Sequence, residues 1–127
     1  MASRDTLARR VREHVERHPE REVLTFRDLK SAPSLERTLT YGSLWQGAAA
    51  FAEPLAGVAR GARALIVMPL GTRLLEAHLG VQLAGAIPIV HSHPSGKVAE
   101  DVYLRHLAHV IELMKPEAVL TNDAFAP

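Results

Sequence analysis

The sequence contains no cysteine. This absence excludes disulfide bonds, thiolate zinc sites and a cysteine nucleophile, and it is compatible with a reducing compartment. An excess of charge of one sign is also missing, because 15 lysine and arginine residues stand against 14 aspartate and glutamate residues and leave a net charge of +1. A chain with this balance has no general electrostatic reason to bind nucleic acid or an acidic membrane surface.

Long apolar runs are missing as well. The longest nearly uncharged stretch, residues 79–93, is too short for a membrane helix and contains two glycines and a proline. Near the N-terminus, arginines and glutamates occupy the positions where the apolar region of a signal peptide would lie. We therefore expect a cytoplasmic protein without a membrane span.

Four motifs of nucleotide binding or hydrolysis are absent, namely G-x-G-x-x-G, G-x-x-x-x-G-K-[ST], H-E-x-x-H and G-x-S-x-G. What is present is a chain of 127 residues that is 47% hydrophobic and 23% charged. These values are typical of one globular domain with a real core.

An amphipathic helix is predicted in residues 1–19. Residues 3–18 have the helical pattern, with a narrow apolar stripe at Leu7, Val11 and Val15. Ser3 or Asp5 can cap the first turn, and Pro19 follows the end. Arginines and glutamates share its outer face, which indicates either a solvated surface or a surface for an anion or a partner.

A β-hairpin is predicted in residues 20–41, with short strands over 23–26 and 38–41 and an irregular polar loop between them. A second helix is predicted over residues 42–59, where Pro54 should kink or shorten it.

Strands and helices then alternate to the end of the chain. Unbroken apolar runs are typical of strands buried on both faces, and their alternation with helices indicates right-handed βαβ units around a parallel sheet. Pro88 cannot donate a ladder hydrogen bond, so it should lie at a bulge or on an edge strand. The fold class expected is α/β, an N-terminal helix and hairpin followed by a βαβαβ unit with a mostly parallel sheet in residues 42–127. The predicted strands are 64–68, 86–90 and 118–121, and the predicted helices are 72–84 and 98–114.

Few elements are available to cover such a sheet, and no further helix follows Asn122. A parallel sheet needs both faces covered. Some apolar sheet surface should therefore stay open, or be closed by another chain or by further polypeptide.

Candidate binding residues follow the second apolar run, at the edge of the sheet where α/β proteins bind ligands. His91 and His93 could line a cleft there, and Lys97 could contact an anionic ligand or be a solvated loop residue. A zinc site could use this pair and a third histidine, although the sequence identifies no carboxylate to accept the other ring N–H of a ligating histidine. Two other histidines, His78 and His106, are interpreted as packed, hydrogen-bonded residues of their helices.

The turn at residues 69–72 lies between a strand and a helix at the same edge. One glycine and one threonine make a weak phosphate cradle, so an ordinary strand-to-helix turn is the simpler interpretation. No pair of acidic residues has the setting of a general acid and base.

Four segments occur in a characteristic order: Leu-Thr-Tyr-Gly-Ser-Leu (39–44), Gly-Ala-Arg-Ala-Leu-Ile-Val-Met-Pro (61–69), Leu-Gly-Val-Gln-Leu-Ala-Gly-Ala-Ile-Pro-Ile (79–89) and Pro-Glu-Ala-Val-Leu-Thr (116–121). This order resembles the start of the adenylate-forming enzymes: AMP-dependent acyl-CoA synthetases, fatty acyl-AMP ligases and peptide-synthetase adenylation domains. The resemblance covers residues 20–122. Two departures are Ala62, where the family usually has an acidic residue, and residues 91–97, which replace a proline-rich loop.

The resemblance implies an enzyme that activates a carboxylate with ATP and Mg²⁺ to an acyl-adenylate and passes the acyl group to the thiol of CoA or a carrier protein. The family's phosphate loop, aromatic-Thr-Glu motif, ribose-binding aspartate and catalytic lysine have no counterpart in these residues. No catalytic residue, cofactor or metal is therefore assigned to this chain. It is expected to be a single N-terminal subdomain, truncated from the larger adenylate-forming fold, inactive alone, with the rest of the enzyme or a second copy as partner.

Two alternatives from other classes remain. The chain could be a free-standing interaction module that buries its open sheet face against itself or a partner. It could also be a small flavodoxin-like ligand-binding domain, although the hairpin before the first parallel strand makes this less consistent with the pattern.

Overall fold

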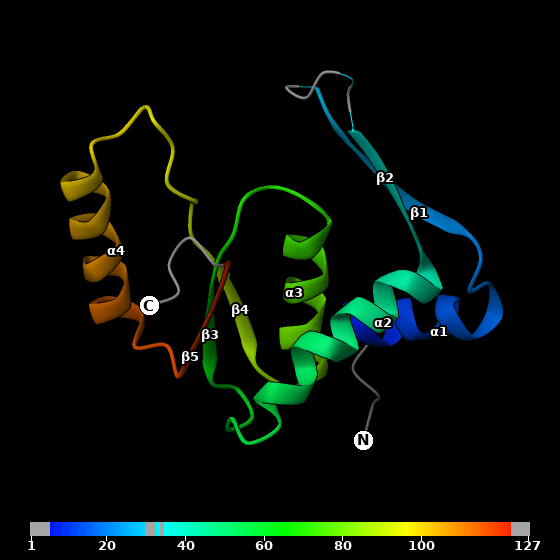
Figure 1. Ribbon diagram of the computed structural model, residues 1–127. Coiled ribbons are helices and arrows are strands. Elements are labelled where there is room, and N and C mark those ends of the chain that lie inside the picture. Colours follow the sequence, from blue (N-terminus) through cyan, green and yellow to red (C-terminus); the bar gives the residue numbers. More distant parts are fainter. Residues whose placement is uncertain (1–5, 30–32, 34, 123–127) are drawn as a thin grey trace.

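A computed structural model describes residues 6–29, 33 and 35–122, and Figure 1 shows the arrangement of its helices and strands. No helix in these ranges is both long and apolar enough to cross a membrane. In chain order the elements are α1 (Leu7–Arg17), β1 (Glu22–Asp28), β2 (Leu35–Thr40), α2 (Tyr41–Ala52), a 3₁₀ turn η1 (Glu53–Leu55), β3 (Arg63–Val67), α3 (Thr72–Leu83), β4 (Ile87–Val90), α4 (Glu100–Met114) and β5 (Ala118–Thr121).

The first helix is capped by Thr6, whose side-chain oxygen accepts a hydrogen bond from the Arg9 N–H at 3.2 Å. Ser3 and Asp5, the predicted caps, lie outside the described residues. No residue of α1 is buried, so this helix rests on the body of the protein rather than entering its core.

The hairpin is antiparallel and projects from the rest of the molecule (Figure 1). Its strands are longer than predicted because exposed polar pairs extend the ladder, including a 2.7 Å ion pair between Arg27 and Glu36. The predicted strand end at Tyr41 is wrong. Thr40 and Ser43 form a reciprocal capping box, so the helix begins at Tyr41.

The second helix ends at Ala52, earlier than predicted. Pro54 occupies the 3₁₀ turn that follows, because proline cannot donate the hydrogen bond that would continue an α-helix. The interpretation that Pro54 shortens this helix is confirmed.

The parallel sheet has the order β4-β3-β5, with Leu65 of the central strand paired to Ile89 and Val119. Right-handed crossovers in this order place α3 and α4 on opposite faces of the sheet, as Figure 1 shows. Pro88 lies on the edge strand β4, where its missing N–H costs no central ladder bond. The predicted α/β fold class is confirmed.

The core lies on the α3 side of the sheet. Ala64 and Ile66 of β3 are fully buried there against η1 and α3. Because side chains alternate along a strand, Leu65 and Val67 point to the other face, where they are also buried. The prediction that this strand is buried on both faces is confirmed.

The opposite face is only partly covered. Ile87 and Val119 share a face with Leu65 and are 50% and 53% exposed. Tyr103 is the only buried residue among those of α4, and Leu113 on the same helix is 63% exposed. The prediction of an open apolar sheet surface is confirmed for the described residues.

Helices α2 and α3 pack closely against each other. A Cβ added to Gly80 would lie 2.5 Å from the carbonyl oxygen of Ala48 and 2.7 Å from the Cβ of Phe51. Ala48 is fully buried at this crossing. Only a residue without a side chain allows the two backbones to approach this closely.

We expect Gly80→Ala to destabilise the protein. The methyl group would press on a backbone carbonyl that cannot rotate away, at a cost of about 2–3 kcal/mol. Alanine's better helix propensity returns about 1 kcal/mol, which leaves a net loss of about 1–2 kcal/mol in the free energy of unfolding. Thermal denaturation followed by circular dichroism measures the change.

The matched control is Gly57→Ala, because a Cβ at Gly57 has no neighbour within 4 Å. This variant should unfold at the wild-type temperature or slightly above it. Equal unfolding temperatures for the two variants would contradict the close-packing argument.

Candidate functional site at the carboxyl edge of the sheet

The three parallel strands end at one edge of the sheet. Val67, Val90 and Thr121 are their last residues, and the segments that follow them meet there. This is the edge at which open α/β sheets bind ligands, because loops and helix N-termini converge on it.

A groove of about 450 Å³ opens beside the end of β3. We call it the sheet-edge groove. Its walls combine aromatic and aliphatic side chains with two arginines and two polar residues from β5 and the position after it. The described lining residues are Phe26, Arg37, Phe51, Met68, Pro69, Leu70, Gly71, Thr72, Arg73, Thr121 and Asn122.

The two arginines are held by one buried carboxylate. Glu76 is only 2% exposed and lies 3.5 Å from Arg73 Nη1 and 3.7 Å from Arg37 Nη2. The guanidinium of Arg73 also lies 4.9 Å from the ring centre of Phe51. Burial of the Glu76 carboxylate is tolerable because both arginines supply counter-charge, and two arginines against one glutamate leave the groove with net positive charge.

Gly47 of α2 makes room for this carboxylate. A Cβ at Gly47 would collide with the Glu76 carboxyl group. The absence of a side chain at this position therefore lets a charged side chain of α3 pass under α2 and reach an arginine of the hairpin.

The turn at residues 69–72 lines the same groove. Gly71 precedes α3 and supplies no side-chain cap, so the first N–H groups of this helix have no side-chain acceptor. The positive end of the helix and the two arginines make the groove electropositive. Its described lining residues contain no carboxylate and no histidine, so this arrangement favours binding of an anionic or apolar group over acid–base chemistry.

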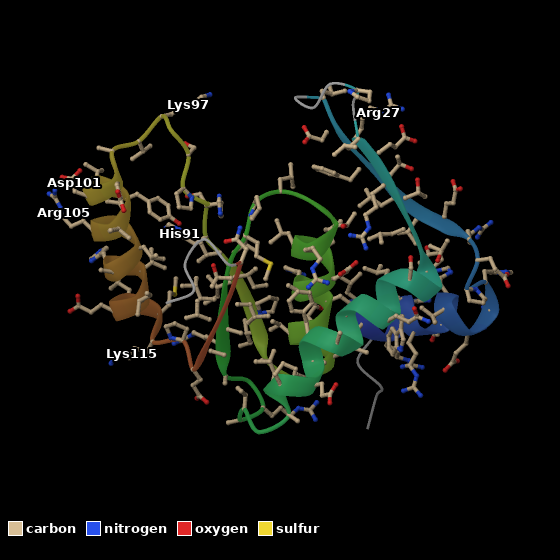
Figure 2. All side chains as sticks on the ribbon, in the orientation of Figure 1. Arg27, His91, Lys97, Asp101, Arg105 and Lys115 are labelled. Atoms are coloured by element: carbon tan, nitrogen blue, oxygen red, sulfur yellow. The ribbon has the colours of Figure 1, made fainter. Side chains whose placement is uncertain are left out.

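His91 and His93 lie near the groove, at the end of β4, where sequence reasoning put them. The His91 N–H donates to the Ile66 carbonyl at 3.0 Å and extends the ladder by one bond. The Nε2 atom of His93 lies 3.4 Å from Nδ2 of Asn122. Lys97 is not brought together with them: Figure 2 shows it at the outer turn of the loop between β4 and α4, pointing away from His91.

Asn122 is the residue of this edge that sequence reasoning missed as a functional candidate. Its Oδ1 atom is buried and has no hydrogen-bond partner, while Thr121 beside it donates to the Val67 carbonyl at 2.9 Å. A buried amide oxygen without a donor needs an explanation, and a ligand group is one candidate. The only signal in the sequence was its position directly after a predicted strand.

The other histidines differ in their surroundings. His78 is partly buried and its Nδ1 lies 3.0 Å from Gln82 Nε2, which confirms the prediction of a packed, hydrogen-bonded residue. His106 is exposed, so the same prediction is wrong there, because α4 turns this side to solvent instead of to the sheet. Within the described ranges no three His, Cys, Asp or Glu side chains are grouped so that they could hold a metal ion.

Tyr103 holds the loop after β4 in place. Its hydroxyl donates to the Ser92 carbonyl at 2.6 Å, and its ring meets His91 edge-on at 5.7 Å. Burial raises the pKa of the Tyr103 phenol above its ordinary value of 10.0, because the phenolate would lose hydration.

Comparison with known proteins identifies similar chains. The family model described as AMP-binding enzyme matches residues 11–126. A fatty acid AMP ligase from Legionella pneumophila has a similar structure, with a TM-score of 0.82, 30% sequence identity, and coverage of 94% of this chain and 20% of that one. No curated protein is similar enough in sequence to match.

Two N-terminal pieces of solved proteins share the fold. The N-terminal domain of FACL13 from Mycobacterium tuberculosis is 16% identical with a TM-score of 0.73, covering 98% of this chain and 28% of that one. The N-terminal subdomain of Klebsiella oxytoca NpsA is 20% identical with a TM-score of 0.74. The match covers 97% of this chain and 28% of that one. The chain thus spans only 20% to 28% of the length of these solved chains.

We expect Tyr103 to titrate above pH 10.0. The chain has two tyrosines, so in a Tyr41→Phe variant the phenolate absorbance reports Tyr103 alone. Because the folded pKa is raised, the native state holds its proton longer than the unfolded state. The free energy of unfolding should therefore fall as pH rises from about 10 through the folded pKa.

The control is Tyr103→Phe, which should lose this alkaline absorbance change and the part of the pH dependence that belongs to it. A midpoint for Tyr103 at or below 10.0 in the folded Tyr41→Phe protein would show that the phenol is neither buried nor committed to the Ser92 carbonyl.

Proposed function

The chain belongs to the AMP-binding enzyme family, and on this premise we propose that it serves as the N-terminal structural subdomain of an AMP-forming acyl ligase. The single observation that carries the proposal is the family match over residues 11–126, on a chain that spans one fifth of a similar ligase. The substrate class proposed is a fatty acid or similar carboxylate, supported by the 30% identity to a fatty acid AMP ligase.

The uncovered apolar surface supports this role. Ile87 and Val119 on the sheet and Leu113 on α4 are at least half exposed. Exposed apolar groups of this size on a small protein typically mark a surface that another part of a fold covers. We propose that the remainder of the ligase is that cover, and that the sheet-edge groove then forms part of the wall of its acyl or nucleotide cleft.

Within this cleft His91 and His93 are the residues proposed to face substrate, because they follow β4 at the ligand-binding edge. Lys97, at the outer turn of its loop, is proposed to contact an anionic group only after the loop is covered by further polypeptide. The thiol acceptor proposed for the whole enzyme is CoA or a carrier protein.

ATP and Mg²⁺ are the cofactors that this family's reaction requires, but the described residues do not fit Mg²⁺. Mg²⁺ prefers accessible carboxylates and water, whereas Glu76 is buried and paired with two arginines. No acidic cluster that could hold a metal occurs in the described part of the chain. We therefore derive no catalytic step from this chain and propose that further polypeptide supplies those groups.

We expect the isolated chain to be inactive in carboxylate-dependent exchange of pyrophosphate into ATP. Phosphoryl and adenylyl transfer depends on fixed cations and metal ions around the phosphates, and the described residues include no group that could hold a metal. The assay compares a series of fatty acids with a no-acid control and uses a full-length fatty acid AMP ligase as positive control. Acid-dependent exchange above background by the purified chain would refute the structural role.

A free-standing interaction module that buries its open sheet face against itself or a partner is the second candidate, and the exposure of Ile87 and Val119 is the observation that favours it. If the module binds itself, the purified chain should form a defined dimer that covers this face together with Leu113 of α4, which is 63% exposed. The family match sets aside the flavodoxin-like alternative.

Sedimentation equilibrium tests the module. We expect Leu113→Glu to convert such a dimer to a monomer, because an unpaired charge would be buried in the contact. Leu29→Glu is the matched control, since Leu29 is 78% exposed on the hairpin, far from α4 in sequence. A wild-type chain that stays monomeric at high concentration would rule out the self-associating form of the module.

A further inference from the structure

A second hollow lies beneath α1, separate from the sheet-edge groove. It has a volume of about 290 Å³ and lies where α1, the hairpin, α2 and α3 meet. We call it the α1 cavity. Leu39 and Leu79 line its inner side and are 2% and 5% exposed, whereas Leu7 on α1 is 59% exposed. The hollow therefore runs from the buried interior to the surface.

Its lining is almost wholly aliphatic. Val11 of α1, Leu24 of β1, Leu44 of α2 and Leu75 of α3 complete the walls. Such a lining favours a hydrocarbon group, because every methylene that leaves water for it is stabilised. The volume is at the lower end of the roughly 300–1,000 Å³ typical of small-molecule sites, so one chain fits and a helix does not.

One end of the cavity is polar. Gln82 lines it together with His78, and their side chains lie 3.0 Å apart. Gln82 also lines an adjoining hollow with Arg9, Arg12 and Trp45. Gln82 therefore lines both the aliphatic hollow and the hollow beside the two arginines.

Both arginines are available to a ligand. Arg9 and Arg12 form ion pairs within α1, to Glu13 at 3.5 Å and Glu16 at 3.2 Å, and their side chains are 49% and 67% exposed. Exposed pairs of this kind contribute little free energy, so a guanidinium can turn to another anion at small cost. Gln82 adds a neutral donor between them and the cavity.

We propose that the α1 cavity binds a single alkyl chain with an anionic head group. The chain lies among the leucines and valines, and the head group lies beside Gln82, Arg9 and Arg12. No described lining residue is shared with the sheet-edge groove. The inference is therefore independent of the proposed ligase role, and either can fail without the other.

Decanoate is the probe, and Trp45 is the reporter because it is the only tryptophan and lies beside the proposed head group. Titration of the full chain below the micelle concentration should change Trp45 fluorescence in a saturable way. Removal of each methylene should weaken binding about fourfold. Decanol, which lacks the charge, should bind on the order of tenfold more weakly.

Two filling variants locate the site. Val11→Phe and Leu75→Phe place a ring in the cavity from two different helices, α1 and α3, and each should abolish the response while circular dichroism shows retained helix. Neither residue is buried in the core, so folding should survive in at least one of them. Val102→Phe is the matched control, because Val102 lies on α4, outside the cavity.

A response that is absent, that does not saturate, or that persists in both filling variants would overturn the proposal. Equal affinity for decanol and decanoate would overturn the assignment of the anionic head. Binding of an amphipathic helical peptide in place of decanoate would overturn it as well, since it would mean that α1 is displaced by a macromolecular partner.

Discussion

The close crossing of α2 and α3 is the constraint on which the rest of the structure depends. Gly80 lets the backbone of α3 approach Ala48, and Gly47 lets Glu76 pass beneath α2. With α3 held this close, its apolar face covers one side of β3 and closes the core. The same crossing places Glu76 within 3.7 Å of the hairpin arginine, Arg37, and so connects the hairpin to α3.

Burial is unequal on the two faces of that sheet. The α3 face is closed by a continuous set of aliphatic side chains, whereas α4 is attached to the other face mainly through its ends. Near its start Tyr103 donates to the Ser92 carbonyl, and at its end Arg63 donates to the Met114 carbonyl at 3.1 Å. Between these bonds apolar surface is exposed, which is costly for an isolated protein and ordinary for one part of a larger fold.

Two hollows of different chemistry result from this packing. The sheet-edge groove is electropositive because Arg37, Arg73 and the start of α3 face it. The α1 cavity is aliphatic because α1 packs against α2 and α3 without entering the core. The groove lies at the carboxyl edge of the sheet, whereas the cavity lies between α1, the hairpin, α2 and α3.

Local pattern in the sequence was enough to predict the helices, the hairpin and the three parallel strands, because periodicity acts within a few residues. It limited Pro88 to a bulge or an edge strand, and the sheet order decided for the edge. It also indicated that His91 and His93 follow a strand at the ligand-binding edge. Only the tertiary structure decided that Arg37 pairs with Glu76, that Asn122 keeps a buried oxygen without a donor, and that His106 faces solvent. These outcomes depend on contacts between residues far apart in the chain and on which helix face meets the sheet, and no short window of sequence contains that information.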